Sequence, residues 1–233
     1  MALCWSCAAS AIELGAVSIA GKQITICRVN VKTDHLGLFL NDDEGQPLES
    51  FTGLNAWLQK SGRKLVFAMN AGMFERNLMP VGLFVSDGRQ LTALNLANGK
   101  GNFFLKPNGV FLVTPAGARI ISSEEYYRIR ERVIIATQSG PILVQSGKIN
   151  PVFDPKSASR LFRNGVGVLS PEEAVFAISD NPVNFYEFAL LFRDVLHCRN
   201  ALFFDGTVSS LFAPQLGRND RRTNLGPMIG VVD

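Results

Sequence analysis

Short apolar runs that begin beside a glycine recur through the middle of this chain. In each case, two β-branched or aromatic runs flank a turn that is rich in Gly, Asp, Ser or Pro, and this pattern is typical of a β-hairpin. Four such segments follow one another, at residues 82–91, 109–121, 140–149 and 165–178. The pattern therefore predicts a domain that is rich in antiparallel sheet.

Two segments space their apolar residues as a helix does. Residues 52–60 place leucine and tryptophan on one face, and Gly62 follows where the helix should end. Residues 185–196 repeat apolar side chains every three to four positions, with Asn184 as an N-cap. Helices combined with hairpins predict an α+β fold, a single domain of mixed, largely antiparallel β-sheet built from hairpins, with two or more packed helices.

The composition fits one globular domain. With 233 residues, of which 47% are hydrophobic and 18% charged, the chain can bury a large core without disulfides or metals as staples. We assign residues 23–233 to this domain and residues 1–22 to an N-terminal segment. Ala9-Ser10-Ala11 resembles a signal-peptidase site, so this segment is either the remnant of an export signal or a simple extension, although the basic start of such a signal is missing.

The charge pattern argues against nucleic acid as a partner. The net charge is only +3, and the arginine cluster at residues 218–222 contains an aspartate and no interleaved aromatic side chain. We interpret that cluster as a solvated loop. The sequence also has no run of about 18 apolar residues, the length that a membrane span needs, so we expect no integral membrane segment.

The cysteines and histidines predict no metal site. Four cysteines are too scattered for a disulfide framework, and only Cys4 and Cys7 have a spacing typical of metal or redox motifs. That pair lies at the start of the chain, without a second pair of cysteines. With only His35 and His197 elsewhere, a structural zinc site is not expected.

An apolar run near the C-terminus stops abruptly at a carboxylate. Residues 201–204 predict a core strand, and Asp205 at its end is held near the interior, where a carboxylate needs partners or a chemical role. The alternative is an Asp-Gly turn between two strands. A glycine that lets the backbone approach a ligand and three hydroxyl residues follow: Gly206, Thr207, Ser209 and Ser210.

Polar residues also precede each hairpin, beside glycines. Taken singly, each of these entrances is explained by turn or bulge geometry. Taken together, they predict one site assembled at strand ends. The entrance residues are Asn70, Gly72, Asn108, Ser139, Gly140, Arg160, Arg163 and Asn164.

Six of these segments, in this order, resemble the motifs of the phosphodiester glycosidase domain family. The resemblance covers about residues 24–232, and six ordered motifs are far more specific than any one of them. A known member of the family removes N-acetylglucosamine from a sugar phosphodiester. The motifs are FAMNAGMF (67–74), PVGLFV (80–85), KPNGVF (106–111), SGPILV (139–144), RNGVGV (163–168) and FDGTVSS (204–210).

The resemblance implies hydrolysis of the bond between an anomeric carbon and a phosphodiester oxygen. Such a reaction needs a carboxylate for the sugar, and we expect Asp205 in that role, with Asp180 second and Glu187 third. Glu187 has a competing role, because it lies three residues after Asn184 and would close a capping box.

The phosphate and the sugar need hydrogen-bond donors as well. We expect Arg163 first, then Arg160, to bind phosphate oxygens through planar guanidinium groups. Asn70 and Asn108 would bind sugar hydroxyl or acetamido groups, because amides both donate and accept. The remaining candidate substrate contacts are Gly72, Ser139, Gly140, Asn164, Gly206, Thr207, Ser209 and Ser210.

The residues leave two other functions open. One is a non-catalytic binding module for glycans or cell-wall phosphopolymers. The other is a metal-dependent phosphodiesterase, in which Asp180 and Asp205 share Mg²⁺ or Ca²⁺. For the glycosidase we expect no cofactor. The resemblance implies a periplasmic or secreted protein that acts on bacterial envelope or exopolymer carbohydrate, and the sequence predicts no oligomeric state.

Overall fold

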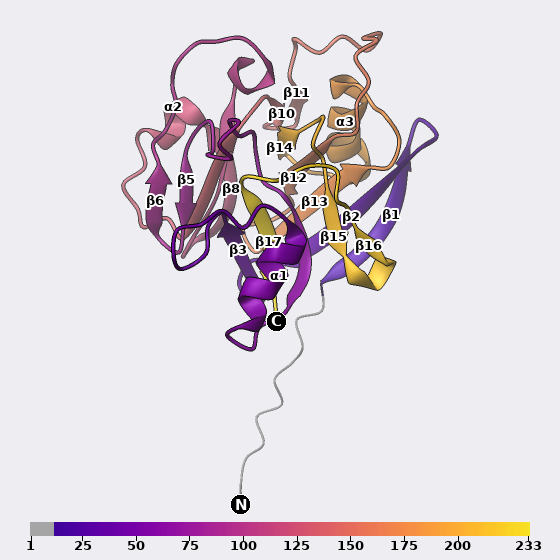
Figure 1. Ribbon diagram of the computed structural model, residues 1–233. Coiled ribbons are helices and arrows are strands. Elements are labelled where there is room, and N and C mark those ends of the chain that lie inside the picture. The colour runs from indigo at the N-terminus through magenta and orange to yellow at the C-terminus, as the bar shows by residue number, and fades with distance from the viewer. Residues whose placement is uncertain (1–11) are drawn as a thin grey trace, which may run out of the picture.

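Three β-sheets form the framework of the protein, and the computed structural model describes residues 12–233 (Figure 1). All strand pairs among these residues are antiparallel. The seven-stranded sheet has the order β1 (Glu13–Ile19), β2 (Lys22–Asn30), β13 (Glu173–Ser179), β12 (Asn164–Val168), β14 (Asn200–Asp205), β10 (Ile142–Gln145) and β11 (Lys148–Ile149).

The two other sheets have five strands each. The β4 sheet has the order β16 (Arg218–Asn219), β15 (Leu211–Ala213), β4 (Leu65–Asn70), β17 (Met228–Val232) and β3 (His35–Phe39). The β9 sheet has the order β6 (Arg89–Thr92), β5 (Phe84–Ser86), β9 (Ile135–Ser139), β7 (Gly109–Thr114) and β8 (Gly117–Ser122). The predicted α+β class is confirmed, and so are all four predicted hairpins: β5–β6, β7–β8, β10–β11 and β12–β13.

The inner faces of the three sheets share one apolar core. Phe176 on β13 lies at its centre, with its ring centroid 5.7 Å from that of Phe67 on β4 and 5.9 Å from that of Phe111 on β7. All three rings are fully buried. Because each ring comes from a different sheet, these contacts join the sheets, and the edge-to-face pair of Phe111 and Phe176 adds about 0.5–1.5 kcal/mol beyond the area it buries.

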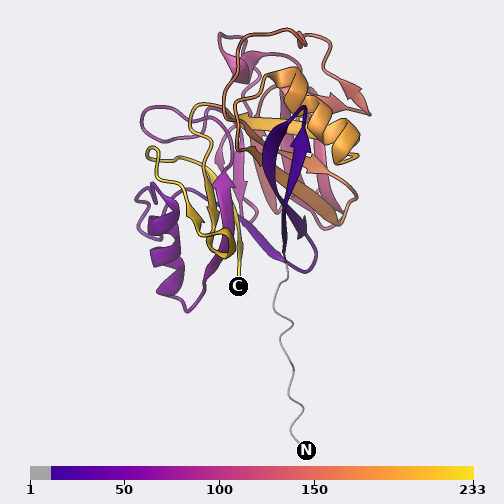
Figure 2. The same ribbon diagram turned by 90° about the vertical axis from the view of Figure 1, so that its right-hand side faces the viewer.

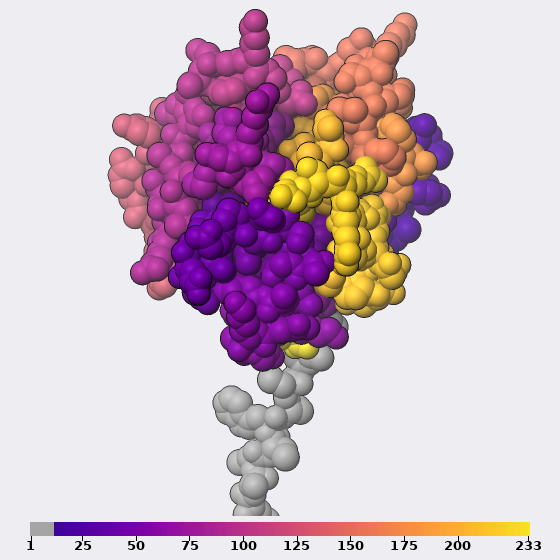
Figure 3. Space-filling model, viewed as in Figure 1, coloured from indigo at the N-terminus to yellow at the C-terminus, as the bar shows by residue number. Residues whose placement is uncertain are grey.

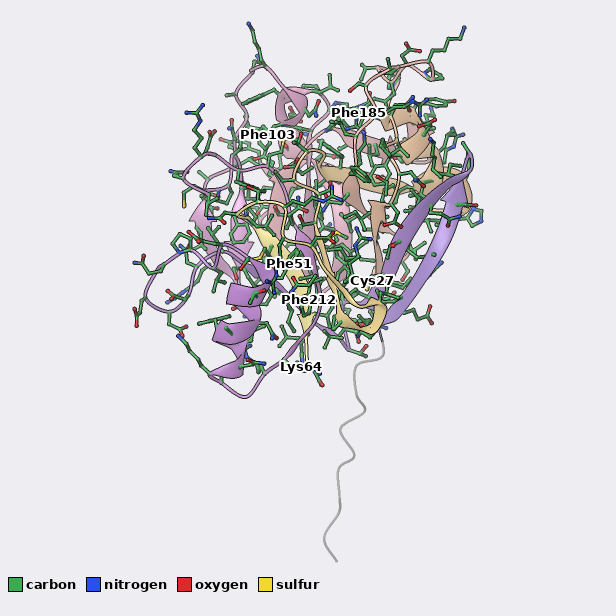
Figure 4. All side chains as sticks on the ribbon, turned by 45° about the vertical axis from the view of Figure 1, so that its right-hand side comes forward. Cys27, Phe51, Lys64, Phe103, Phe185 and Phe212 are labelled. Atoms are coloured by element: carbon green, nitrogen blue, oxygen red, sulfur yellow. The ribbon has the colours of Figure 1, made fainter. Side chains whose placement is uncertain are left out.

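Each sheet also has an outer apolar face that a helix covers. Helix α1 (Phe51–Gln59) packs on the β4 sheet, α2 (Ser123–Tyr126) on the β9 sheet and α3 (Phe185–Leu190) on the seven-stranded sheet. Figure 2 shows α1 and α3 on opposite sides of the body of sheets. Phe51 of α1 meets Phe212 of β15, with ring centroids 6.2 Å apart (Figure 4).

The helix boundaries follow the predicted signals with one difference. Ser50 caps α1, and Asn184 caps α3 by accepting from the backbone N–H of Glu187, whose side chain completes the predicted capping box. The second predicted helix is α-helical only to Leu190. Residues Leu191–Val195 continue as a π-helix, a rare geometry that apolar spacing does not distinguish from an α-helix.

The N-terminal segment contributes a strand. β1 pairs with β2 along its whole length, so residues 13–19 belong to the seven-stranded sheet. Cys4, Cys7 and the Ala9-Ser10-Ala11 site lie outside the described residues. Cys27 and Cys198 are buried free thiols. Among residues 12–233, no helix has both the length and the apolar character needed to cross a membrane.

Candidate active site

The polar strand ends predicted to form one site do meet, at the place where the three sheets come together. Asn70 ends β4, Ser139 ends β9, Asp205 ends β14 and Asn164 begins β12. Asn164 is the register partner of Asp205, and the strand pair is irregular between Asn164 and Gly165. That irregularity is a β-bulge position, a feature that often re-aims side chains near active sites.

Asn164 is the hub of this junction. Its amide Nδ2 donates to the backbone O of Asn70 at 2.8 Å and to the Asn70 side-chain Oδ1 at 3.0 Å. Its Oδ1 accepts from the backbone N–H of Asp205 at 3.1 Å and lies 3.3 Å from the Ser209 hydroxyl oxygen. One fully buried side chain thus links the seven-stranded sheet to the β4 sheet and holds the backbone of Asp205.

Further hydrogen bonds connect the β9 sheet and the turn after Asp205 to this junction. The Ser139 hydroxyl donates to the Phe204 backbone O at 2.9 Å, which joins the β9 sheet to β14. The backbone N–H of Ser210 donates to Asn70 Oδ1 at 3.0 Å. We call these buried residues the polar joint: Asn70, Ser139, Asn164, Ser209 and Ser210.

Among the described residues, Asp205 is the only carboxylate residue that both contacts the polar joint and lines an open pocket. Its Oδ1 accepts from the backbone N–H of Gly206 at 2.5 Å. Burial raises the pKa of Asp205 from 3.8 to about 6, although the backbone N–H groups of Gly206 and Val208 and the charge of Arg163 oppose the shift. A carboxyl group with this pKa can take up or release a proton near neutral pH.

Arg163 lies beneath Asp205 rather than in the pocket. It is fully buried, its Nε donates to the Val183 backbone O at 2.9 Å, and its guanidinium stacks 3.8 Å from the ring centre of Phe185. Burial lowers the pKa of Arg163 to about 10, and the charge of Asp205 opposes that shift. Arg163, expected to bind phosphate directly, is instead a buried cation that interacts electrostatically with Asp205.

Two buried donors at this junction have no partner among the described residues. They are Nδ2 of Asn70 and Nη1 of Arg163. A side chain at Gly206 would begin 3.8 Å from this Arg163 Nη1, so the unpaired donor lies directly under the Asp205-Gly206 turn. An unpaired buried donor costs about 1–3 kcal/mol. Each unsatisfied buried group in a folded protein needs an explanation, and a functional role is one of them.

A pocket of about 350 Å³ opens above Asp205. We call it the inner pocket. Asp205, Gly206 and Thr207 are the predicted site residues that line it, while Lys100 and Glu75 line it with exposed charged side chains. The other lining residues are Met73, Phe74, Val81, Gly101, Asn102, Phe103, Phe104 and Val208.

Several residues that were predicted to contact substrate instead form the structure behind the wall of the inner pocket. Asn108 is buried, and its Nδ2 donates to the Phe103 backbone O at 3.1 Å, which holds the short 3₁₀ turn η1 (Asn102–Phe104) in place. A side chain at Gly140 would begin 2.7 Å from Cβ of Asn108, so glycine is required there. Figure 4 shows Phe103 and Phe185 in the same half of the molecule, far from Lys64.

The glycine and the serines predicted to contact substrate also have structural roles. Gly72 has a φ of 133° and lies against Thr137 and Gln138, where a side chain would be strained. The Ser209 hydroxyl donates to the Asp205 backbone O at 3.0 Å, and that of Ser210 donates to the Val208 backbone O at 2.9 Å. These hydroxyls fix the turn after Asp205 and do not line the pocket.

The second-choice carboxylates are engaged elsewhere. Asp180 accepts from the Thr25 hydroxyl at 2.8 Å and pairs with Arg218 Nη1 at 2.5 Å, which connects β2 and β16 across two sheets. Glu187 closes the capping box of α3 and pairs with Arg160. Neither carboxylate lines the inner pocket. The expected catalytic roles of Asp180 and Glu187 and the expected phosphate role of Arg160 therefore gain no support from their positions.

Sequence reasoning missed the charged lining residues. Lys100 lies in an irregular polar stretch, residues 95–101, that has no periodicity, and Glu75 follows the motif that ends at Phe74. Their closeness in sequence to the family motifs could have identified them, since each lies within a few residues of one. Within residues 12–233, no group of three or more His, Cys, Asp or Glu side chains is placed to hold a metal ion.

Comparisons with known proteins identify the family of this chain. The family model for phosphodiester glycosidase matches residues 63–232. The uncharacterized protein YigE of Escherichia coli (strain K12) is 36% identical over 184 residues, which are 79% of this chain and 72% of YigE.

Solved structures share the fold at low sequence identity. The catalytic domain of zebrafish N-acetylglucosamine-1-phosphodiester alpha-N-acetylglucosaminidase, auto-inhibited by its pro-peptide, has a TM-score of 0.64 at 14% identity over 95% of this chain and 82% of its own. A hypothetical protein from Synechocystis has a TM-score of 0.54 at 16% identity, over 95% and 61%. A Burkholderia pseudomallei K96243 protein provisionally described as exported has 0.56 at 11%, over 90% and 74%. By its sequence match and its fold, this chain belongs to the phosphodiester glycosidase family.

Proposed function

We propose that this protein hydrolyses the glycosidic C–O bond of a glycosyl phosphodiester and releases the sugar and a phosphomonoester. The observation that carries the proposal is Asp205, a carboxyl group with a pKa raised by burial to about 6, at the base of an open pocket. The family match supports a glycosidase, and the zebrafish enzyme of similar fold is named for cleavage of this kind of bond.

Asp205 acts as the ionised carboxylate in this mechanism. It stabilises the positive charge that develops on the sugar ring in the oxocarbenium-like transition state, or it takes the proton from the attacking water. Its position is fixed by Asn164 and Gly206 through their hydrogen bonds to the Asp205 backbone and side chain. Because the support is rigid and buried, little reorganisation is needed during the reaction.

Lys100 and Thr207 provide the phosphate side of the inner pocket. Both are exposed in the pocket lining, and Lys100 forms no ion pair with any other described residue. An ammonium group binds phosphate oxygens as a compact charge, and a hydroxyl adds a neutral donor. The leaving phosphate monoester is already a good anion, so the reaction needs less general acid than hydrolysis of an ordinary glycoside.

The substrate is expected to be an N-acetylglucosaminyl or glucosyl phosphodiester of bacterial envelope or exopolymer origin, and the protein to work outside the cytoplasm. Support for export comes from the Burkholderia pseudomallei relative in fold and from the N-terminal segment of the sequence. Fractionation of cells that express the full chain checks this expectation, since the protein should appear in the periplasmic or secreted fraction.

Turnover of these diesters in ¹⁸O-water tests the reaction. Label on the released sugar means C–O cleavage, as proposed, and label on the phosphate means attack at phosphorus. The variant Asp205→Asn should lower kcat by about 10²–10⁴-fold, the range for loss of a general base. Asp87→Asn is the matched control, because Asp87 is exposed, lies outside the inner pocket and has a positive φ that asparagine also tolerates.

The two alternative functions give different results in the same experiment. A non-catalytic module would bind the diesters and turn over none of them. A metal-dependent phosphodiesterase would place the label on phosphate and lose activity in EDTA, with recovery on addition of Mg²⁺ or Ca²⁺. For the glycosidase we expect activity to persist in EDTA.

A further inference from the structure

The segment that follows helix α2 carries an arginine at every second position and takes no part in the proposed mechanism. Residues 128–134 have the sequence RIRERVI and lead from α2 to β9. The backbone N–H of Arg128 donates to the Glu125 O at 3.0 Å, and that of Ile134 donates to the Val113 O at 2.8 Å, so both ends are held against neighbouring elements. Figure 3 shows this part of the chain, in pink, at the surface on the left edge of the molecule.

The side chains of this segment alternate between two faces. The odd-numbered side chains of residues 129–133 line a pocket of about 270 Å³ together with Gln90 of β6, whereas the even-numbered ones are exposed. Alternation of this kind is that of extended backbone, in which successive side chains point to opposite sides. The outward-facing set consists of Arg128, Arg130 and Arg132.

The charges of these arginines are not neutralised by the rest of the described chain. None of the three forms an ion pair with any residue of 12–233. Arg130 donates through Nη1 to the backbone O of Tyr127 at 3.1 Å and of Ile129 at 2.9 Å, which fixes its position without removing its charge. The neighbouring carboxylates already have partners: Glu131 pairs with Arg119, Glu124 pairs with Lys106, and Glu125 completes the capping box of α2.

Exposed apolar side chains flank the arginines on both sides. Tyr127, at the C-terminal cap of α2, is 67% exposed, and Ile134 is 36% exposed. A soluble polyanion would interact with the charges alone. A bilayer, in contrast, also accepts an aromatic ring at the level of its headgroups and an aliphatic side chain at the boundary with the acyl chains. Arginine suits the headgroup level as well, because its guanidinium binds phosphate oxygens through two parallel hydrogen bonds.

We propose that this segment is a docking surface for a membrane that contains anionic lipids. We call the five residues the basic strip: Tyr127, Arg128, Arg130, Arg132 and Ile134. The arginines contact the lipid phosphates, and the tyrosine ring lies among the headgroups. None of these residues lines the inner pocket, so the inference does not depend on the proposed reaction.

Co-sedimentation of the full chain with vesicles tests the basic strip. The protein should bind vesicles of phosphatidylcholine with about one third phosphatidylglycerol, should bind far less to phosphatidylcholine alone, and should be released at about 1 M salt, where the Debye length is about 3 Å. The triple variant Arg128→Ala, Arg130→Ala, Arg132→Ala should lower the partition coefficient about 100-fold, because each arginine near an anionic surface contributes about a factor of five. Tyr127→Ala should lower it several-fold with all charges kept.

Three further variants separate charge from folding. Arg132→Ala alone should lower binding about fivefold, and this side chain forms no hydrogen bond or ion pair with any other described residue, so the fold does not depend on it. Replacement of all three arginines by lysine keeps the charge, and binding should stay within about threefold of the wild type. The matched control removes three charges from other exposed positions and should also stay within about threefold: Lys60→Ala, Lys156→Ala and Arg199→Ala.

Four results would overturn the assignment. The first is a wild-type protein that does not bind the anionic vesicles. The second is an alanine triple variant of the strip that loses no more binding than the matched control. The third is vesicle binding that Tyr127→Ala leaves unchanged, which would mean that the strip recognises negative charge alone. The fourth is binding to dextran sulfate, a soluble polyanion, without binding to vesicles.

Discussion

The polar joint and the lining of the inner pocket lie next to each other but differ in almost every physical property. Residues of the joint are buried, and their side chains form hydrogen bonds with the backbone of neighbouring segments. The charged lining residues Lys100 and Glu75 are exposed and form no ion pair among residues 12–233. Asp205 belongs to both regions. The family motifs therefore mark the place where three sheets join, and the groups free to bind a ligand lie one layer further out.

The largest expected effect comes from the joint. Asn164→Ala removes three hydrogen bonds and leaves the partly buried N–H of Asp205 without an acceptor. We expect the free energy of unfolding to fall by about 3–5 kcal/mol, since each orphaned buried group costs about 1–3 kcal/mol. Urea unfolding measures this loss.

The control for that variant is Asn219→Ala. Asn219 is exposed and its amide makes one long hydrogen bond, 3.4 Å, to Thr52, so stability should change by less than about 0.5 kcal/mol. If Asn164→Ala lowered stability by under 1 kcal/mol but abolished substrate binding, Asn164 would belong with the ligand contacts, and the division between joint and lining would be wrong.

The next effect comes from the pocket lining, and it concerns activity rather than stability. Lys100→Ala should lower kcat/KM by about 10–100-fold, because a charge-assisted hydrogen bond to phosphate is worth about 1.5–3 kcal/mol. Its free energy of unfolding should stay within about 0.5 kcal/mol of the wild type. Steady-state kinetics and urea unfolding of the same preparation separate the two quantities.

Lys156→Ala serves as the control for Lys100, since Lys156 is exposed and outside the inner pocket. Its kinetics should match the wild type. A Lys100→Ala enzyme with unchanged kcat/KM would remove Lys100 from the phosphate site.

A smaller change in the free energy of unfolding than that of Asn164→Ala is expected at Asp205, where the two regions meet. Its folded pKa, about 6, exceeds the ordinary value of 3.8, so the folded chain holds this proton more tightly than the unfolded chain does. The stabilising contribution of the group is therefore complete below about pH 4 and is lost as pH rises through about 6. Asp205→Asn, which cannot ionise, should raise the free energy of unfolding by about 1–3 kcal/mol at pH 8.

The same substitution should have little effect on stability at pH 4. Urea unfolding at both pH values measures the difference. A loss of stability on Asp205→Asn at pH 8 would mean that the ionised carboxylate stabilises the fold through its contacts with Gly206 and Arg163, which would contradict the raised pKa.

Patterning predicted the fold well because the signals are local. Apolar runs around turn residues predicted the four hairpins, and Asn184 was predicted as the N-cap where α3 begins. The π-helix of residues 191–195 was not predictable, since its apolar positions satisfy an α-helix equally well. The contact of three sheets through Phe67, Phe111 and Phe176 depends on topology that no local pattern specifies.

The meeting of the polar strand ends was predicted, but which of their side chains face a pocket was not. Strand ends beside glycine correctly marked where Asn70, Asn164 and Asp205 meet. Which side chains face the pocket depends on the irregular register at Asn164, and a one-residue shift reverses the face that each side chain occupies. The buried placement of Arg163 and the exposed placement of Lys100 both follow from such long-range packing.

The pH dependence of kcat/KM for a glycosyl phosphodiester is the most direct test of the claim that Asp205 is the catalytic carboxylate. If the ionised form is active, kcat/KM should rise with pH, follow an apparent pKa of about 6 and level off above it, and this rise should be absent from the residual activity of Asp205→Asn. A profile that is flat between pH 5 and 8, or an unchanged rise in Asp205→Asn, would show that another group carries the reaction.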